Sequence, residues 1–472
     1  MSAPQRDLLD RFTDIVGAAH AIRDAEQLAP FVTDPRGRFV GRTALVLRPG
    51  SVEEVAAILK LADQTRTAIV PQGGNTGLVG GQIPSEAGDE IVVSLSRLKQ
   101  VRAADPKNNV MIVEAGVTLA AARGTAEGID RQFPLSLASE GSCEIGGNLA
   151  TNAGGTAVLA YGNARALVLG VEVVLASGAV WDGLRTLRKD NTGYDLKDLF
   201  IGSEGTLGVI TAAVLRLFPR PRGRSVALIG LSSPDSALRF LDVAAARAGS
   251  GLVACEIMAR IALETALRHL TGVRDPLPSR HAWYLLIEVT SARSQSEAET
   301  MVATIFSAAA DRGFVEDGVR AESGDQAETL WRIRDSLSDV QKREGGSIKH
   351  DIAVPVAAVP DFLKRASAAV VALIPGARPF PFGHLGDGSI HFNVSQPPDM
   401  EKEAFLARWE EVNAAVHGVV LELGGTISAE HGIGRLKRGL LAEVKGAVEM
   451  DLMRRLKQTL DPNGILNPGR VL

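Results

Sequence analysis

The stretch 70–81, VPQGGNTGLVGG, decides the fold, because it places five glycines within nine residues directly after the apolar run AIV. A short apolar run of this kind predicts a buried strand, here one that opens into a glycine loop. Backbone N–H groups that have no Cβ atoms beside them can form a concave nest for phosphate oxygens. The chain contains neither G-x-G-x-x-G nor the Gly-Lys dipeptide of a Walker A loop. The stretch therefore predicts a phosphate-binding loop of neither common type, with a purely structural turn as the weaker alternative.

The residues before this loop predict a βαβ unit. The segment ALVLRP (44–49) is typical of a buried strand, and SVEEVAAILKLADQT (51–65) is typical of a helix capped by Ser51. Short connections join these elements to the strand that precedes the loop. Further apolar pieces follow at 90–95, 109–116, 167–178 and 208–221, so the first half is predicted to be α/β or α+β.

Three more glycine clusters lie far from the first one. They are GSCEIGGNLATNAGGT (141–156), GSEGTLGVIT (202–211) and the closing DPNGILNPGRVL (461–472). Small polar residues between the glycines add side-chain hydrogen bonds where the backbone also donates. Structural turns could explain any one cluster, but four together favour a backbone that approaches a ligand at several places.

Composition excludes several classes of function. The chain has 472 residues, a net charge of −4 and no run of Lys and Arg, which argues against nucleic acid as a partner. Cys143 and Cys255 are its only cysteines, so neither a disulfide framework nor a thiolate zinc site is expected. The start MSAPQRDLLDRFTD lacks the apolar core of a signal peptide, and no apolar run approaches the roughly 20 residues that span a bilayer. We expect a cytoplasmic protein without a membrane span.

A second domain is predicted beyond the segment 217–225, LFPRPRGRS, whose two prolines and glycine favour a linker. Strand-like and helix-like segments alternate after it, at 225–231, 233–248, 283–292 and 296–313. This order favours an α+β domain with an antiparallel sheet covered by helices on one face.

The four glycine clusters resemble the FAD-binding domain of the vanillyl-alcohol oxidase and para-cresol methylhydroxylase superfamily, from about residue 30 to the C-terminus. The resemblance implies that the first loop holds the FAD pyrophosphate, the second lines the isoalloxazine ring, the third reaches the adenosine half and Asn467 returns to the flavin. Some members attach FAD through a histidine in the first loop, where this chain has Gly74-Asn75-Thr76. We therefore expect non-covalent FAD. The cofactor-binding residues implied are Pro71, Gly73, Gly74, Asn75, Thr76, Gly77, Gly80, Gly81, Gly141, Ser142, Gly146, Gly147, Asn148, Thr151, Asn152, Gly154, Gly155, Glu204, Gly208, Ile210 and Asn467.

Two of the eight histidines lie in PFGHLGDGSIHFNV, residues 381–394. Alternation along SIHFNV predicts a strand with His391 and Asn393 on one face, and His384 could fold back over the GDG turn. Glu430 and His431 follow about forty residues later. Two imidazoles and a carboxylate suit Zn²⁺, Mn²⁺ or Fe²⁺, although any single histidine is more often structural. A non-haem iron oxygenase is disfavoured, because its triad starts with His-x-Asp and its fold has little helix.

The C-terminal half resembles the D-2-hydroxy-acid dehydrogenases of this superfamily, a group that includes enzymes acting on 2-hydroxyglutarate. The resemblance implies a divalent metal, with zinc as the expected ion, held by His384, His391 and Glu430. It also implies His431 as the catalytic base that removes the hydroxyl proton while hydride passes to flavin N5. The substrate-binding residues implied are Arg334, Ser338, Lys349 and Asn393. The predicted domains are 1–222 for FAD, 223–425 for substrate, and 426–472 for a segment that completes the active site and returns to the FAD domain.

Two cationic side chains and a metal favour a dianion with a carboxylate at each end, because guanidinium grips carboxylate in a bidentate manner. D-2-hydroxyglutarate is therefore the expected substrate, with D-lactate, D-malate or another D-2-hydroxy acid as the near alternative. A flavin-dependent alkyl-transferring synthase is the alternative from another reaction class, and a flavin-storing or flavin-sensing protein is the non-enzymatic one. We expect an electron acceptor such as an electron-transfer flavoprotein, and a homodimer.

Overall fold

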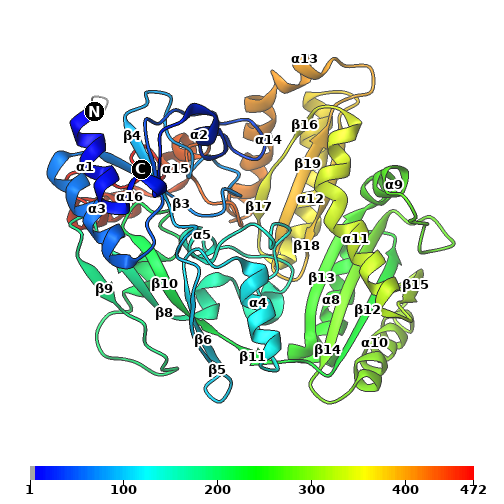
Figure 1. The fold of residues 1–472 in the computed structure, drawn as a ribbon. Coiled ribbons are helices and arrows are strands. Elements are labelled where there is room, and N and C mark those ends of the chain that lie inside the picture. The colour runs from blue at the N-terminus through cyan, green and yellow to red at the C-terminus, as the bar shows by residue number, and fades with distance from the viewer. Residues whose placement is uncertain (1–5) are drawn as a thin grey trace. The chain divides into compact units, whose positions relative to one another are not determined.

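The computed structural model describes residues 6–472, so the first five residues of the N-terminal segment, which lacks the apolar core of a signal peptide, lie outside the described part. The chain forms two compact units (Figure 1). The first unit contains the residues up to Gly155, Gly162–Arg220 and Glu430–Leu472. The second unit contains Thr156–Tyr161 and Pro221–Ala429. No helix within residues 6–472 combines the length and the apolar character that crossing a bilayer requires.

The first unit holds a small mixed sheet and a larger antiparallel one, in the strand orders β1-β2-β4-β3 and β5-β6-β10-β8-β9, with a separate β7–β11 pair. Its strands are β1 Ala21–Ile22, β2 Val46–Leu47, β3 Ala68–Gln72, β4 Glu90–Ser94, β5 Val101–Asp105, β6 Val110–Glu114, β7 Arg131–Gln132, β8 Val168–Val174, β9 Val180–Asp182, β10 Val209–Arg216 and β11 Phe218–Pro219. Its α-helices are α1 Arg6–Val16, α2 Ala25–Val32, α3 Val52–Thr65, α4 Leu119–Gly128, α5 Ile145–Ala150, α7 Lys197–Phe200, α15 Arg438–Val444 and α16 Ala447–Leu460.

The predicted βαβ unit is confirmed. Strands β2 and β3 both pair in parallel with β4, and α3 connects them. The hydroxyl of Ser51 accepts a hydrogen bond from the Glu54 amide and so caps α3, as the sequence predicts. Residues of α3 such as Ile58 and Leu59 are fully buried against Ile69 of β3. Burial of this helix face fixes where β3 ends and the first glycine loop begins.

The second unit is built on one antiparallel sheet in the order β15-β12-β14-β13-β18-β19-β16, with β17 paired to β19. Its strands are β12 Gly223–Leu231, β13 Leu252–Ala259, β14 Trp283–Ser291, β15 Asp317–Arg320, β16 Ser347–Ile348, β17 Asp351–Ala353, β18 Arg378–His384 and β19 Ser389–Ser395. Its α-helices are α6 Val158–Tyr161, α8 Pro234–Ala248, α9 Arg260–His269, α10 Gln295–Ala310, α11 Gly324–Val340, α12 Val359–Leu373, α13 Lys402–Leu406 and α14 Trp409–Glu422.

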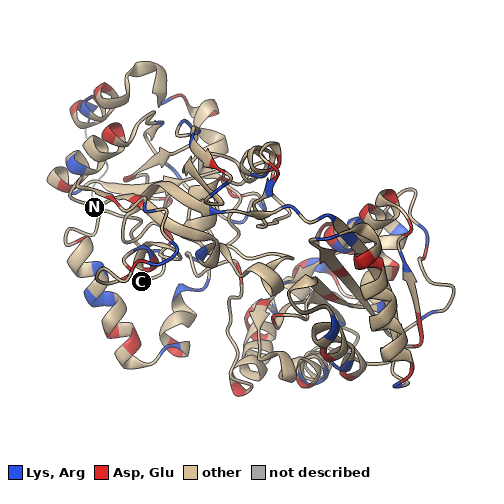
Figure 2. Cartoon of the chain, turned by 90° about the horizontal axis from the view of Figure 1, so that it is seen from below, with Lys and Arg blue, Asp and Glu red and all other residues tan. Residues whose placement is uncertain are grey.

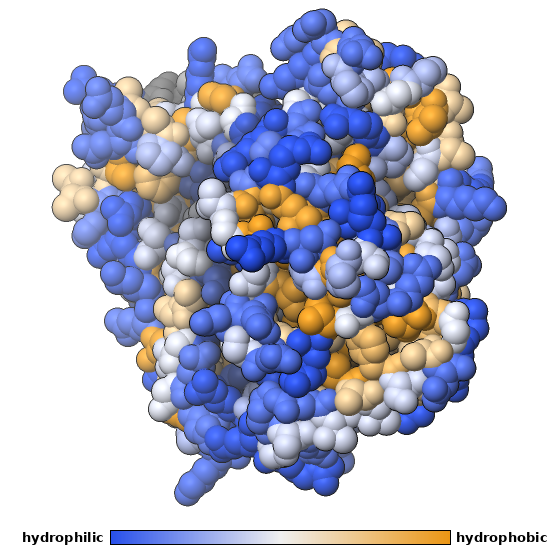
Figure 3. All heavy atoms as spheres, turned by 90° about the vertical axis from the view of Figure 1, so that its right-hand side faces the viewer, coloured by the Kyte–Doolittle hydropathy of each residue, from blue (hydrophilic) through white to orange (hydrophobic). Residues whose placement is uncertain are grey.

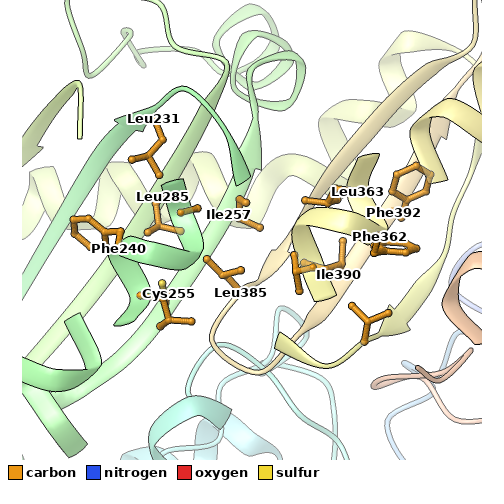
Figure 4. Close-up of a cluster of buried hydrophobic side chains, with 14 of the residues drawn as sticks. Leu231, Phe240, Cys255, Ile257, Leu285, Phe362, Leu363, Leu385, Ile390 and Phe392 are labelled. Carbon is orange, nitrogen blue, oxygen red and sulfur yellow. The ribbon is translucent and has the colours of Figure 1, made fainter. Parts of the chain in front are cut away.

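Helices cover both faces of this sheet, so the prediction of one covered face was wrong. Along β12, Ile229 and Leu231 face the core under α8, α10, α12 and α14, while Val226 and Leu228 face the core under α9 and α11. Figure 4 shows the first of these cores, with Phe362 of α12 close to Phe392 of β19. The continuous apolar run VALIGL at 226–231 was the signal for two covered faces, since a strand covered on one face alternates apolar and polar residues.

The outer surfaces of both units mix charges of both signs. Figure 2 shows Lys and Arg interspersed with Asp and Glu along the helices, and neither sign dominates in that view. Figure 3, which views the molecule from the side where β15 lies in Figure 1, shows mostly hydrophilic residues with apolar residues in separate patches.

Candidate active site

A pocket in the first unit brings together three of the four glycine clusters and one residue of the fourth. About 900 Å³ of space in and at the mouth of this pocket is unfilled by protein atoms, and part of it is open to solvent. Fifteen of the predicted cofactor residues line it, and they are Pro71, Gly73, Gly74, Asn75, Thr76, Gly77, Gly81, Gly146, Gly147, Asn148, Thr151, Glu204, Gly208, Ile210 and Asn467. His431, the predicted base, lies on the same wall. Glycines make up much of the lining, and they leave backbone N–H groups accessible to a ligand.

Glycine at position 74 is required by the way the first two loops meet. A Cβ atom at Gly74 would lie 1.9 Å from the carbonyl oxygen of Ser142 and 3.1 Å from the Cα atom of Cys143. No side chain fits at the first of these distances, so the two loops approach each other backbone to backbone. Gly74 therefore sets the shape of the pocket as well as lining it.

Asn467 of the C-terminal segment and Glu204 of the third glycine cluster connect the parts of the chain that line the pocket. The side-chain amide of Asn467 donates to the carbonyl oxygens of Gly81 (3.0 Å) and Glu204 (2.8 Å), and thus joins the first and third glycine loops. The Glu204 carboxylate accepts hydrogen bonds from the amides of Ile433 (2.7 Å) and Gly434 (2.8 Å). Burial raises the pKa of Glu204, and these two amide donors oppose the rise.

Three buried oxygens in the pocket make no hydrogen bond within residues 6–472. One is Oγ of Ser203, and the other two are Oδ1 of Asn467, whose residue is 2% exposed, and Oε2 of Glu144, whose residue is 7% exposed. Burial raises the pKa of Glu144 to about 7. A buried polar atom without a partner is costly, so these three oxygens fit a pocket built to receive a ligand with hydrogen-bonding groups.

Glu144 was missed by the sequence predictions, since it sits between cysteine and isoleucine inside a glycine cluster. An acidic residue in an otherwise small and apolar stretch, SCEIGG, is the signal that could have identified it.

Six predicted cofactor residues do not line the pocket, and they are Gly80, Gly141, Ser142, Asn152, Gly154 and Gly155. Their structural roles are partly visible. Gly80 faces the ring of Phe39, Asn152 accepts a hydrogen bond from the Arg165 amide (3.0 Å), and Gly155 lies against the carbonyl oxygen of Ser136. These three residues contact parts of the chain outside the pocket lining and so help to hold the loops in shape.

In the second unit, polar side chains form a row across one face of the sheet. Glu256 of β13 is directly opposite His384 of β18, and His391 of β19 is opposite both Phe382 of β18 and Asp351 of β17. Opposed residues in an antiparallel pair point to the same face. The rings of His384 and His391 lie 6.0 Å apart between centroids. The predicted strand forms, and His384 folds back over the turn to the face that carries His391.

The opposite face of β19 supports this assignment. Ile390, Phe392 and Val394 alternate with His391 and Asn393 and are fully buried in the core of Figure 4. A shift of one residue in the register would turn this apolar set towards the face that carries Asp351 and Asn393, so the packing fixes the direction of the imidazoles.

Glu256 connects His384 to Arg334 of α11. His384 Nδ1 lies 2.6 Å from Glu256 Oε1, and Arg334 Nε donates to Glu256 Oε2 at 2.7 Å. Glu256 is 1% exposed. Burial by itself would raise the pKa of Glu256, but attraction to His384 and Arg334, with hydrogen bonds from both, outweighs burial and lowers it to about 2. The carboxylate is therefore ionised at neutral pH.

The remaining predicted substrate residues lie near the same helix. Lys349 Nζ donates to the carbonyl oxygen (2.8 Å) and the hydroxyl (2.9 Å) of Ser338, which brings two of them together. Asn393 is 2% exposed, and its side-chain amide donates to Gln341 Oε1 at 2.8 Å. Gln341 was not predicted, because its link to Asn393 spans 52 residues.

The predicted metal ligands are divided between the units. His384 and His391 belong to the second unit, and Glu430 is the first residue of the last segment of the first unit. Thr426 forms a bridge with Ala353 at the end of β17, so the chain leaves the second unit beside the strand that pairs with His391.

The sequence matches two protein families. Residues 43–183 match "FAD binding domain", and residues 220–471, more than half of the chain, match "FAD linked oxidases, C-terminal domain". These matches agree with the pocket, since the first covers the first two glycine clusters and the second covers both histidines, His431 and Asn467.

Curated relatives match along nearly the whole chain. The "D-2-hydroxyglutarate dehydrogenase" of Xanthomonas citri pv. viticola is 38% identical over 92% of this chain and 90% of its own length. The "D-2-hydroxyglutarate dehydrogenase, mitochondrial" of Arabidopsis thaliana is 36% identical over 98% of this chain and 80% of its own. A "D-2-hydroxyglutarate–pyruvate transhydrogenase" of Saccharomyces cerevisiae is 35% identical over 95% of this chain and 90% of its own length.

Solved structures share the fold. A p-cresol methylhydroxylase superposes with a TM-score of 0.78 at 17% identity, covering 99% of this chain and 97% of its own. An alkyldihydroxyacetonephosphate synthase gives a TM-score of 0.75 at 16% identity, and the match covers 99% of this chain and 87% of that one. At these identities the likeness concerns the fold alone, and it confirms the α+β class with a flavin domain of the vanillyl-alcohol oxidase type. The chain belongs to the FAD-linked oxidases, as an FAD-dependent oxidoreductase of the D-2-hydroxy-acid dehydrogenase family.

Proposed function

We propose that this enzyme oxidises D-2-hydroxyglutarate to 2-oxoglutarate with non-covalent FAD and a divalent metal. The observation that carries the proposal is the position of His431 on the wall of the pocket that the flavin loops form. An imidazole has a pKa near neutrality and is well matched to removing the proton of a substrate hydroxyl. The names of the relatives from Xanthomonas citri and Arabidopsis thaliana supply the substrate.

The residues fit both cofactors. Backbone amides of three glycine loops and the oxygens of Asn467 and Glu144 would surround FAD. His384, His391 and Glu430 would hold the metal, since neutral imidazole and carboxylate are ligands for zinc and similar ions. When bound, FAD supplies the hydride acceptor and the metal lowers the pKa of the substrate hydroxyl.

We assign the following steps to the chain's own residues. His431 takes the hydroxyl proton as the C2 hydride leaves, so the alcohol loses two electrons and two hydrogens and becomes a ketone. Lys349, Arg334, Ser338 and Asn393 hold the carboxylates. Glu256 already balances the charge of Arg334, so Arg334 would contribute hydrogen-bond direction more than net positive charge. Lys349 would then be the main cation for the distal carboxylate.

A substrate panel tests this proposal. With a dye as electron acceptor, we expect kcat/KM for D-2-hydroxyglutarate to exceed that for D-malate and D-lactate, with no turnover of the L-enantiomer. A clear preference for D-lactate would show that D-lactate is the substrate, and the proposed oxidation of a D-2-hydroxy acid would still stand. The absence of turnover with every hydroxy acid would favour the alkyl-transferring synthase class instead.

A second candidate function concerns the electron acceptor. The Saccharomyces cerevisiae relative is named for transfer between D-2-hydroxyglutarate and pyruvate, which makes a 2-oxo acid an alternative to an electron-transfer flavoprotein. Adding pyruvate to the substrate-reduced enzyme would distinguish them, because reoxidation with formation of D-lactate requires a transhydrogenase. Zinc as the metal, a homodimer and a cytoplasmic location are further proposals made from the sequence, while the Arabidopsis thaliana relative is named as mitochondrial.

A further inference from the structure

Glu256 is the most deeply buried charged group in the second unit that has no part in the proposed reaction. Both of its oxygens are engaged, Oε1 with His384 and Oε2 with Arg334. Replacing a buried ion pair with apolar residues is often neutral or stabilising, so such a pair is weak support for a role in stability alone. A buried carboxylate between a proposed metal ligand and a proposed substrate ligand therefore calls for another explanation.

The contact fixes the tautomer of His384. Glu256 Oε2 accepts a hydrogen bond from the Arg334 guanidinium, and a carboxylate paired in this way is an acceptor, so the 2.6 Å contact with Oε1 assigns the proton to His384 Nδ1. The ring nitrogen that retains its lone pair is then Nε2, which is the atom that a metal would bind. A histidine that donates its other ring N–H to a carboxylate is a common outer-shell arrangement at metal sites, and it raises the basicity of the ligand.

The sheet holds this arrangement rigidly. Glu256 and His384 are directly opposed residues on β13 and β18, so backbone pairing sets their separation. The Arg334 guanidinium lies 5.2 Å from the ring centre of Phe382, next to His391 on the same face. Arg334 donates to Oε2 of Glu256 and so holds the carboxylate in place, while Oε1 of the same carboxylate orients His384.

We propose that Glu256 is a positioning residue that holds His384 as the Nδ1–H tautomer with Nε2 directed at a divalent metal, and that couples this ligand to Arg334. The inference rests on the metal site of the proposed function. It goes beyond that site, since it assigns a role to a residue outside the ligand set and the substrate contacts.

The test measures Co²⁺ affinity in the FAD-loaded enzyme after chelation, by absorption at wavelengths beyond the flavin bands. We expect Glu256→Gln to weaken Co²⁺ binding by about 10–100-fold, with the FAD content unchanged. Glu344→Gln is the matched control, because Glu344 also contacts a histidine, His269 (2.6 Å), and an arginine, Arg268 (2.7 Å), in the same unit. We expect this control to bind Co²⁺ like the wild type.

The outcomes separate the inference from the proposed function. If the wild type binds no Co²⁺, or if His391→Gln binds it equally well, the proposed metal site is wrong and the inference falls with it. If the wild type binds Co²⁺ and Glu256→Gln binds it with the same affinity, only the positioning role is overturned.

A second variant and a measurement on the wild type cover the case in which Glu256→Gln does not fold. The double variant Glu256→Met with Arg334→Met removes both charges together, and it should show the same weak Co²⁺ binding. In the wild type, ¹⁵N NMR of labelled histidine should show a protonated Nδ1 on His384 and a shift of its Nε2 resonance on addition of Zn²⁺. A bare Nδ1 that shifts with Zn²⁺ would contradict the proposal.

Discussion

At the residue scale, the position of His431 in the pocket wall leads to a direct prediction. We expect His431→Ala to retain FAD and to slow flavin reduction by D-2-hydroxyglutarate by at least about 100-fold, because a positioned general base contributes on this order. Rapid-mixing absorbance measures the reduction rate, and the resting spectrum measures the FAD content. His20→Ala, in the same unit but away from the pocket, is the control. A wild-type rate in His431→Ala would exclude it as the base.

Lys349 carries the prediction for substrate choice. Its ammonium group is held by two oxygens of Ser338, so it is oriented before substrate arrives. We expect Lys349→Ala to lower kcat/KM for D-2-hydroxyglutarate by at least about tenfold, which corresponds to the loss of one charge-assisted hydrogen bond. The effect on D-lactate, which has no distal carboxylate, should be much smaller. Lys342→Ala serves as the control, because Lys342 is an exposed lysine just after the end of α11 that contacts Asp339. Equal losses for both substrates would remove Lys349 from this role.

Glu144 carries a prediction for pH dependence. Burial raises the pKa of Glu144 from the ordinary 4.5 to about 7. At a pH between these two values, Glu144 is protonated in the folded apoprotein and ionised in the unfolded chain. The corresponding contribution to the free energy of unfolding is complete below the ordinary pKa and is lost as pH rises through about 7. The loss is at most roughly 3 kcal/mol, by the conversion of pKa shifts to free energy.

Urea denaturation of the apoprotein at about pH 5 and about pH 8 measures this contribution. We expect the wild type to lose more stability over this interval than Glu144→Gln, which has no proton to release. Parallel pH profiles for the two proteins would show that Glu144 stays ionised in the fold.

At the scale of elements, the glycine loops make the FAD pocket sensitive to a single methyl group. We expect Gly74→Ala to purify with little FAD, since the new Cβ atom would lie 1.9 Å from the Ser142 carbonyl oxygen and push the first two loops apart. Gly124→Ala in α4 is the matched control, because a Cβ atom at Gly124 would have no neighbouring atom within 4 Å and alanine favours helix. Flavin absorbance per protein measures the outcome, and full occupancy in Gly74→Ala would contradict this account of the loop contact.

Local patterns predicted the elements that carry the site, because each pattern is read over a few residues. Ser51 at the start of α3 and the alternation that directs His391 and Asn393 to one face were both visible in sequence. Contacts over long separations were not visible. Glu256 lies 128 residues before His384, and only the pairing of β13 with β18 brings them together.

At the scale of the whole molecule, each unit supplies a different part of the proposed reaction. The first unit holds the flavin loops and His431, and the second holds His384, His391 and the Glu256–Arg334 pair. The family resemblance predicted a flavin domain and a substrate domain, and the part assigned to the second unit stays a prediction. The domain boundaries at 222 and 425 stay predictions, and the structure divides the chain at Arg220 and Ala429.

Anaerobic mixing of the purified enzyme with D-2-hydroxyglutarate tests the central claim most directly. The account predicts rapid bleaching of the flavin by the D-enantiomer, none by the L-enantiomer, loss of bleaching after chelation and its return when a divalent metal is added. A flavin that stays oxidised with metal supplied would contradict the proposed substrate. Bleaching that survives complete chelation would contradict the role assigned to His384, His391 and Glu430.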